Sequence, residues 1–311
     1  LKARADAKLN QGQNFSRLMN YAMYGPKSPA TNLLTEAELA SMNPQELVDR
    51  IHNQNNYKHR ILYYGPSSSK DLLATIEQYH QVPATLKDIP AGNEYSYLET
   101  PATKVLVAPY EAKQIYMAQI SNLDKKYDPA IEPTRELYNE YFGGGMNSIV
   151  FQEMRETRGL AYSAWASIMP PSYLKYPYVL RTQIATQNDK MAQAIDAFDE
   201  IINNMPESET AFKIAKEGLI SRLRTDRTVK EQVLWSFIGL RNLGLEEDRD
   251  KQIFEKVQAM TLADVKAAQE KWVKNRKYVY GILGDIQDLD LNYLKTLGPI
   301  QTVTQEEIFG Y

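Results

Sequence analysis

The sequence predicts an α+β fold made of two tandem copies of one domain, the first truncated and the second complete. Three observations lead to this fold class: a long stretch with helical periodicity, several short segments rich in aromatic and β-branched residues, and a faint internal repeat. At about 150 residues per domain, the 311 residues suggest about two domains. A content of 43% hydrophobic and 24% charged residues is that of an ordinary globular protein with a sizeable core.

Helical periodicity dominates residues 189–275. Between 189 and 204 the apolar residues recur at intervals of four, three and four, which is typical of a helix with one buried face. These residues are Met191, Ile195, Phe198 and Ile202. Similar spacing predicts helices over 211–224 and 229–242, and we expect Trp235 and Phe237 in the second of these to lie in the core.

Four segments have the composition of β-strands. Two of them, YSAWASI and YVLRTQIATQ, are enriched in aromatic and β-branched residues and are bounded by prolines, which favours a strand pair. The four predicted strands are 104–108, 114–122, 162–168 and 178–187.

The internal repeat begins with two similar helix starts, at Met42 and at Met260. In each, a capping residue is followed three positions later by an acid, which is the signature of a capped helix. Each helix is followed by an apolar segment that we predict to be a strand, and then by a second helix. The two strands are 60–65 and 279–284, and the second helices are 70–79 and 289–297.

This repeat defines the predicted domains. Residues 1–86 are the C-terminal part of a first copy, 87–100 form a connector, and 101–311 are a complete second copy. The region around the connector is rich in proline, glycine and polar residues. The opening residues LKARADAKLNQGQNF have neither a start methionine nor the apolar core of a secretory signal. We therefore expect the chain to begin within a longer protein.

Charge and cysteine content exclude several classes of function. The net charge of −3 gives no cationic field that would attract nucleic acid or an anionic membrane. No apolar run approaches the roughly 18 residues that span a bilayer. The absence of cysteine excludes disulfides, thiol nucleophiles and cysteine-bound metals, although it leaves the compartment open. A periplasmic or secreted location is slightly favoured over a cytoplasmic one.

The segment 141–163, YFGGGMNSIVFQEMRETRGLAYS, combines the features that carry chemistry. Its glycines Gly143, Gly144 and Gly145 permit unusual backbone angles, and they lack the following Lys-Ser/Thr of a phosphate loop. Asn147 or Ser148 can cap a helix that runs to Arg158 and stops at Gly159. Arg155 in its last turn and Tyr162 at the next strand then emerge at the same end of the sheet. Together they form a pair of hydrogen-bond donors at neutral pH.

This segment resembles one in the non-catalytic half of the pitrilysin/insulinase family of zinc metallopeptidases, and the resemblance extends over the whole chain. It implies tandem α/β-sandwich domains, two per half, with the two halves closing around a substrate chamber. It also implies that Arg155 and Tyr162, seven residues apart, hydrogen-bond the substrate near the scissile bond. The glycines Gly143 to Gly145 would form a tight turn that binds substrate by lining the chamber, or that merely allows close packing. Arg158 is the competing arginine.

The sequence departs from the full family pattern because the inverted His-x-x-Glu-His zinc motif is absent. The three histidines, His52, His59 and His80, have no glutamate in the required arrangement, so no metal ligand is predicted in this chain. The zinc cofactor of the full enzyme would come from a zinc-binding N-terminal half, on the same polypeptide or in a separate subunit.

The resemblance therefore implies the C-terminal half of a zinc-dependent endopeptidase, which binds substrate peptide, completes the active site and is inactive alone. One alternative is a non-catalytic subunit of a two-chain peptidase, and another is an inactive scaffold or assembly homologue. Extended peptide could also add as a strand to an exposed edge of the sheet.

Overall fold

The computed structural model describes residues 1–311, which form two compact units. The larger unit consists of Leu1–Leu33, Tyr95–Asp226 and Leu240–Tyr311. The smaller unit consists of Leu34–Glu94 and Arg227–Gly239. The buried hydrophobic side chains belong to the larger unit.

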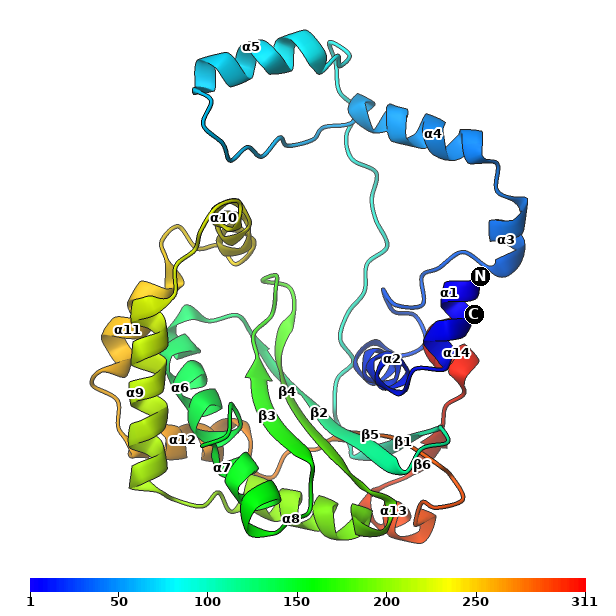
Figure 1. Ribbon diagram of the computed structural model, residues 1–311. Helices are drawn as coiled ribbons and strands as arrows, with labels where there is room; N and C mark the ends of the chain where they lie inside the picture. The colour runs from blue at the N-terminus through cyan, green and yellow to red at the C-terminus, as the bar shows by residue number, and fades with distance from the viewer. The chain divides into compact units, whose positions relative to one another are not determined.

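A six-stranded mixed sheet forms the centre of the larger unit (Figure 1). Its strands are β1 (Lys104–Pro109), β2 (Gln114–Lys126), β3 (Ser163–Met169), β4 (Pro177–Gln187), β5 (Val279–Gly284) and β6 (Ile300–Thr302). The spatial order is β3-β4-β2-β5-β1-β6. Strand β1 runs parallel to β5 and β6, and the other neighbours are antiparallel. The four predicted strands 104–108, 114–122, 162–168 and 178–187 are confirmed, and with them the α+β class.

Helices cover both faces of this sheet (Figure 1). One face carries α6 (Glu132–Phe142), α8 (Met191–Asn203), α9 (Glu209–Thr225), α11 (Arg249–Val257) and α12 (Leu262–Trp272). The opposite face carries α1 (Lys2–Lys8), α2 (Gln11–Tyr24) and α14 (Gln305–Phe309). Strand alternation divides β1 between the two cores, since Val105 and Val107 face one core and Leu106 and Ala108 the other.

The remaining helices are short or lie in the smaller unit. In the larger unit they are η2 (Pro129–Ile131), α7 (Ile149–Phe151), η3 (Gln152–Thr157), η4 (Asn188–Lys190) and α13 (Leu291–Leu297). In the smaller unit they are α3 (Glu36–Ser41), α4 (Pro44–Asn53), η1 (Gln54–Asn56) and α5 (Ser69–Tyr79). Helix α10 (Gln232–Asn242) begins in the smaller unit.

The two helix starts of the predicted repeat are both capped. The Asn43 side chain accepts from the Gln45 N–H at 3.0 Å, and the Thr261 N–H donates to Asp264 at 2.7 Å. Each cap gives a partner to a backbone N–H group that the helix itself leaves unpaired. The predicted repeat is a statement about homology between two segments. It stays a prediction, as do the domain boundaries at residues 86 and 100.

Two local expectations are wrong. Residues 60–65 form no strand, because no sheet lies beside them, and the smaller unit has only the isolated bridge between Tyr57 and Lys87. Segment 279–284, by contrast, is β5, since β1 and β2 pair with it on both sides. Trp235 and Phe237 are 63% and 54% exposed rather than buried. The apolar residues of α10 are distributed around the whole helix, so the sequence marks no single face for burial.

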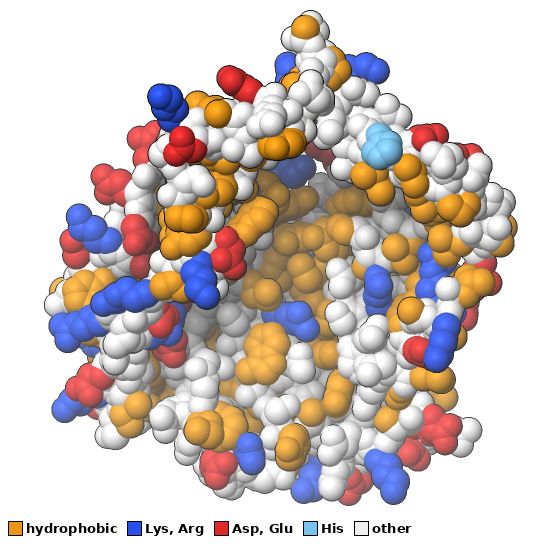
Figure 2. Space-filling view, turned by 45° about the horizontal axis from the view of Figure 1, so that its top comes forward, with side chains coloured by type: hydrophobic (Ala, Val, Ile, Leu, Met, Phe, Trp, Pro, Cys, Tyr) orange, Lys and Arg blue, Asp and Glu red, His pale blue; other side chains and the backbone are white.

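The surface carries charges of both signs. On the face drawn in Figure 2, lysine and arginine side chains are interspersed with aspartate and glutamate, which fits the net charge of −3. No helix of the chain is both long and apolar enough to cross a membrane.

Candidate functional site

The glycine run connects α6 to the short helix α7 and lies against strand β3. A Cβ at Gly143 would meet the Ala166 carbonyl oxygen at 2.1 Å, and one at Gly144 would meet the Asn139 carbonyl oxygen at 2.7 Å. Gly145 has φ +145°, a conformation that residues with a side chain rarely adopt, and the space beside it is open. The first two glycines therefore allow close packing, and the third allows the turn.

The helix α6 also covers the outer edge of β3 near its C-terminal end. The Ile168 N–H donates to the Asn139 side-chain oxygen at 2.9 Å, and the Ile168 carbonyl accepts from Asn139 at 3.1 Å and from Arg135 at 3.2 Å. An amide side chain thus takes the place of a neighbouring strand, while Gly143 packs on Ala166. Edge strands covered in this way resist pairing with a further strand. A peptide cannot pair with β3 at these residues without displacing α6. Strand addition elsewhere along an edge of the sheet stays a prediction.

The helix that carries Arg155 begins where the sequence predicts. Ser148 caps it by accepting from the Phe151 N–H at 3.4 Å, and the hydroxyl donates to the Gly145 carbonyl at 2.7 Å. Gly159 ends it with φ +59°, and the Leu160 N–H folds back onto the Met154 carbonyl at 2.9 Å. Its second half, η3, is a π-helix, a wider turn that is frequent at functional sites.

Arg155 and Tyr162 lie together at the surface. The guanidinium carbon of Arg155 is 5.6 Å from the centre of the Tyr162 ring and 5.1 Å from that of Phe151. The Arg155 side chain is 46% exposed and Tyr162 is 71% exposed, so both residues lie at the surface. Phe151 was not predicted as part of this group, although its position four residues before Arg155 is the spacing at which helical side chains meet.

Arg158, the competing arginine, is engaged elsewhere. It lies 2.8 Å from Glu200 on α8 and 3.5 Å from Glu153. The hydrogen bond to Glu200 raises the pKa of Arg158 above its ordinary value. Arg155 has a single acidic neighbour, Glu156 at 3.6 Å. Arg158 therefore links the π-helix to α8. The guanidinium of Arg155 is more weakly paired than that of Arg158.

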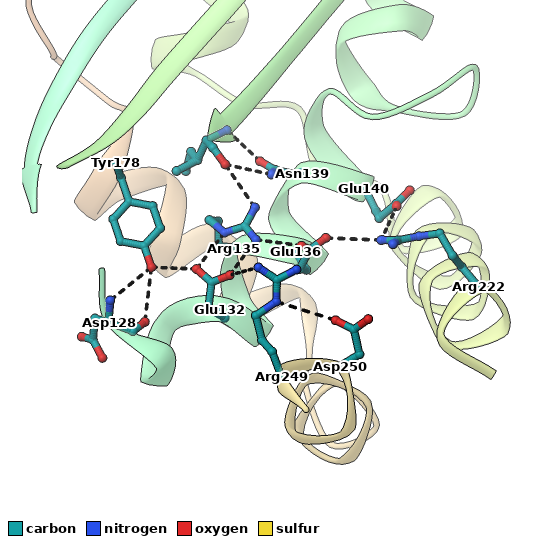
Figure 3. Close-up of polar contacts among 11 residues, drawn as sticks. Asp128, Glu132, Arg135, Glu136, Asn139, Glu140, Tyr178, Arg222, Arg249 and Asp250 are labelled. Carbon is teal, nitrogen blue, oxygen red and sulfur yellow. Dashed lines mark hydrogen bonds and ion pairs between the residues drawn. The ribbon is translucent and has the colours of Figure 1, made fainter. Parts of the chain in front are cut away.

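A buried charge network centred on the first turns of α6 holds this helix in place (Figure 3). Glu132, 1% exposed, accepts hydrogen bonds from Arg135 at 2.8 and 3.0 Å and from the Tyr178 hydroxyl at 2.6 Å. Burial, together with the Glu132 carboxylate, raises the pKa of Tyr178 far above its ordinary value. Burial opposes ionisation of Glu136, but the Arg135 charge outweighs it and holds the Glu136 pKa below the ordinary value. The network fixes α6, and with it the glycine run, against β3 and β4.

The three histidines are not arranged as in a His-x-x-Glu-His zinc site. In the smaller unit the Nε2 atoms of His59 and His80 face each other at 2.7 Å, and the His59 Nδ1 lies 2.7 Å from the Tyr57 carbonyl. His52 is exposed on α4. The described residues contain no group of three or more His, Asp or Glu side chains arranged to hold a metal ion. The residues of this chain therefore do not fit a catalytic zinc.

The chain is a mixed α+β protein that presents an arginine–tyrosine pair at its surface and has no metal-ligating cluster. The Peptidase M16 inactive domain family matches residues 60–219, more than half of the chain. The chain belongs to this family, and the resemblance to the non-zinc half of the pitrilysin-like fold is confirmed. No curated protein matches the sequence.

Solved structures share this fold at low sequence identity. A peptidase M16 inactive domain from Pseudomonas fluorescens has a TM-score of 0.65 at 20% identity, covering 92% of this chain and 68% of that chain. A chain of complex III2 from Candida albicans has a TM-score of 0.61 at 14% identity, covering 95% and 72%. The ferredoxin protease FusC, in complex with Arabidopsis ferredoxin, has a TM-score of 0.60 at 14% identity, covering 91% and 31%.

Proposed function

We propose that this chain is the substrate-holding half of a zinc endopeptidase and completes an active site whose metal is bound by another half. The observation that carries the proposal is the exposed pair of Arg155 and Tyr162, two fixed donors on one surface. Family membership supports the class of activity, and the absence of a metal-ligating cluster supports a division of labour between halves.

In this proposal the two donors act on the peptide backbone. The Arg155 guanidinium and the Tyr162 hydroxyl donate hydrogen bonds to a substrate carbonyl, whose oxygen gains negative charge as the bond is cleaved. Donors help most when they are already in place, because no reorganisation is then needed. Phe151 and Tyr162 hold the guanidinium by cation–π contact, which limits its movement without consuming its N–H groups.

The glycine run is proposed to line the same surface. Gly145 has open space where a side chain would lie, so a peptide backbone can approach it closely. Gly143 and Gly144 contribute by packing against β3 and α6, and thereby place this backbone.

The test is reconstitution. The chain, the zinc-binding half and the mixture of both are assayed for cleavage of a peptide library, with wild type, Arg155→Met and Arg158→Met compared. The proposal expects cleavage only by the mixture, with a large loss for Arg155→Met and a small one for Arg158→Met. Full activity of Arg155→Met in a folded protein would refute the role of Arg155.

A second candidate is an inactive scaffold subunit. The likeness to a chain of the Candida albicans complex III2 favours it, since that protein is part of a multisubunit assembly. Stable association of the two halves without any peptide cleavage would support this candidate over the first.

A further inference from the structure

The β3–β4 hairpin leaves one face of the sheet partly open. Side chains alternate along these strands, and one set, including Ile168 and Leu180, is buried in the core against α6 and α8. The other set is partly exposed, because the helices of the opposite face pack on β5, β1 and β2 instead. This open face consists of Ser163, Trp165, Ser167, Arg181 and Gln183.

Arg181 is the only charged residue in this set, and it has no counter-ion. Its guanidinium carbon lies 5.4 Å from the centre of the Trp165 ring. Its single hydrogen bond is a long one, 3.5 Å from Nη2 to the Gln183 side-chain oxygen. Its Nε is shielded from solvent and has no partner, and no carboxylate lies within 4.0 Å of the guanidinium.

Three other arginines of the larger unit are paired with carboxylates, whereas the partly buried Arg17 and Arg276 donate to neutral oxygens instead. Arg135 is bonded to Glu132 and Glu136, and Arg222 is bonded to Glu136 and Glu140. Arg249 lies 3.5 Å from Glu132. A cation removed from water is costly unless an anion accompanies it. Burial accordingly lowers the pKa of Arg181 from its ordinary value.

We propose that Arg181, held over the ring of Trp165, binds a carboxylate of the peptide substrate on this open face. Nη1, which makes no hydrogen bond, and Nη2, which makes only the long one to Gln183, form a fork that a carboxylate accepts in a bidentate manner. The chemistry fits a singly charged planar anion, because the neighbours are a tryptophan ring, two serine hydroxyls and an amide, with no second cation. The tryptophan face also provides apolar contact for the methylene groups beside the carboxylate.

The carboxylate has two possible sources in a peptide, an acidic side chain or the C-terminus. That the ligand is a peptide rests on the proposed function, whereas the preference for a carboxylate rests on Arg181 itself. Four short peptides of one sequence separate these sources: central glutamate or glutamine, each with a C-terminal acid or amide. Binding to the isolated chain is measured by calorimetry, with tryptophan fluorescence as a second readout.

The expected result is that one carboxylate raises affinity about tenfold or more over its neutral counterpart, as for a hydrogen bond to a charged group. Arg181→Met should abolish this difference, Arg181→Lys should keep part of it, and the control Arg158→Met should leave it intact. The conservative lysine variant guards against a loss caused by misfolding. Near-ultraviolet circular dichroism checks that each variant is folded.

Three results would overturn the inference: equal binding of all four peptides, an unchanged preference in Arg181→Met, or no binding of any peptide at millimolar concentration. Peptide cleavage by the reconstituted halves is a separate readout. Carboxylate-dependent binding without cleavage would refute the proposed enzyme and support the Arg181 site. Cleavage without a carboxylate preference would support the proposed enzyme and refute the Arg181 site.

Discussion

Asp199 offers a quantitative test of how the larger unit is held together. It lies on α8 and accepts hydrogen bonds from the Tyr280 hydroxyl at 2.8 Å and from the Gln119 side chain. Burial raises the Asp199 pKa from 3.8 to about 6. Because the folded state holds this proton more tightly than the unfolded state, Asp199 destabilises the fold as pH rises from about 4 to about 6.

The magnitude follows from the shift. A rise of about two pKa units, at about 1.4 kcal/mol per unit, costs about 3 kcal/mol of stability at neutral pH. Asp199→Asn removes the charge, but it also weakens the hydrogen bonding to Asp199 by about 1 kcal/mol, because the acceptor is no longer charged. We therefore expect the variant to be about 2 kcal/mol more stable than wild type near pH 7, and to lose this advantage near pH 4.

The assay is urea unfolding of both proteins between about pH 4 and pH 7. The neighbouring Glu200 is a matched control of opposite sign, because its hydrogen bond to Arg158 lowers the Glu200 pKa. The stability that Glu200 contributes is present above its unfolded pKa and lost as pH falls, so Glu200→Gln should be relatively less stable at the higher pH. A difference between wild type and Asp199→Asn that does not vary with pH would refute the reasoning.

Two further predictions concern the support of the site. Gly143→Ala places a Cβ 2.1 Å from the Ala166 carbonyl oxygen, where only backbone can move, and should lower the free energy of unfolding by about 2 kcal/mol or more. Urea unfolding tests this, with Gly145→Ala as the comparison. A neutral effect of Gly143→Ala would contradict the close packing. Glu132→Gln leaves Arg135 without its main partner in the core and should cost about 3 kcal/mol. Thermal unfolding measures the second effect, and a change below about 1 kcal/mol would show that the network holds α6 only weakly.

Much of the fold could be predicted because its signals are local. The spacing of Met191, Ile195, Phe198 and Ile202 specified α8, and their burial confirms it. The stop at Gly159 was predictable for the same reason, since a left-handed residue after a helix leaves a mark in the sequence. The absence of a strand at 60–65 could not be predicted from composition, because an apolar segment becomes a strand only when another strand pairs with it.

The candidate site shows the same limit. Sequence spacing placed Arg155 and Tyr162 at one end of the sheet, and the structure brings them to one exposed surface. The contact of the Phe151 ring with Arg155 has ordinary helical spacing, so the sequence allowed it without singling it out, and no residue type marks the π-helix that carries Arg155. Arg181 stands out because no carboxylate lies near it, and only the three-dimensional packing shows which residues are its neighbours.

The central claim is that Arg155 and Tyr162 serve a reacting peptide rather than the fold. Tyr162→Phe tests this most directly, because it removes one hydroxyl from a 71% exposed ring and leaves the cation–π contact in place. In the enzyme reconstituted with its zinc-binding half, kcat should fall by about 100-fold or more while KM changes little, as for the loss of a transition-state donor. A kcat equal to that of wild type would contradict the claim.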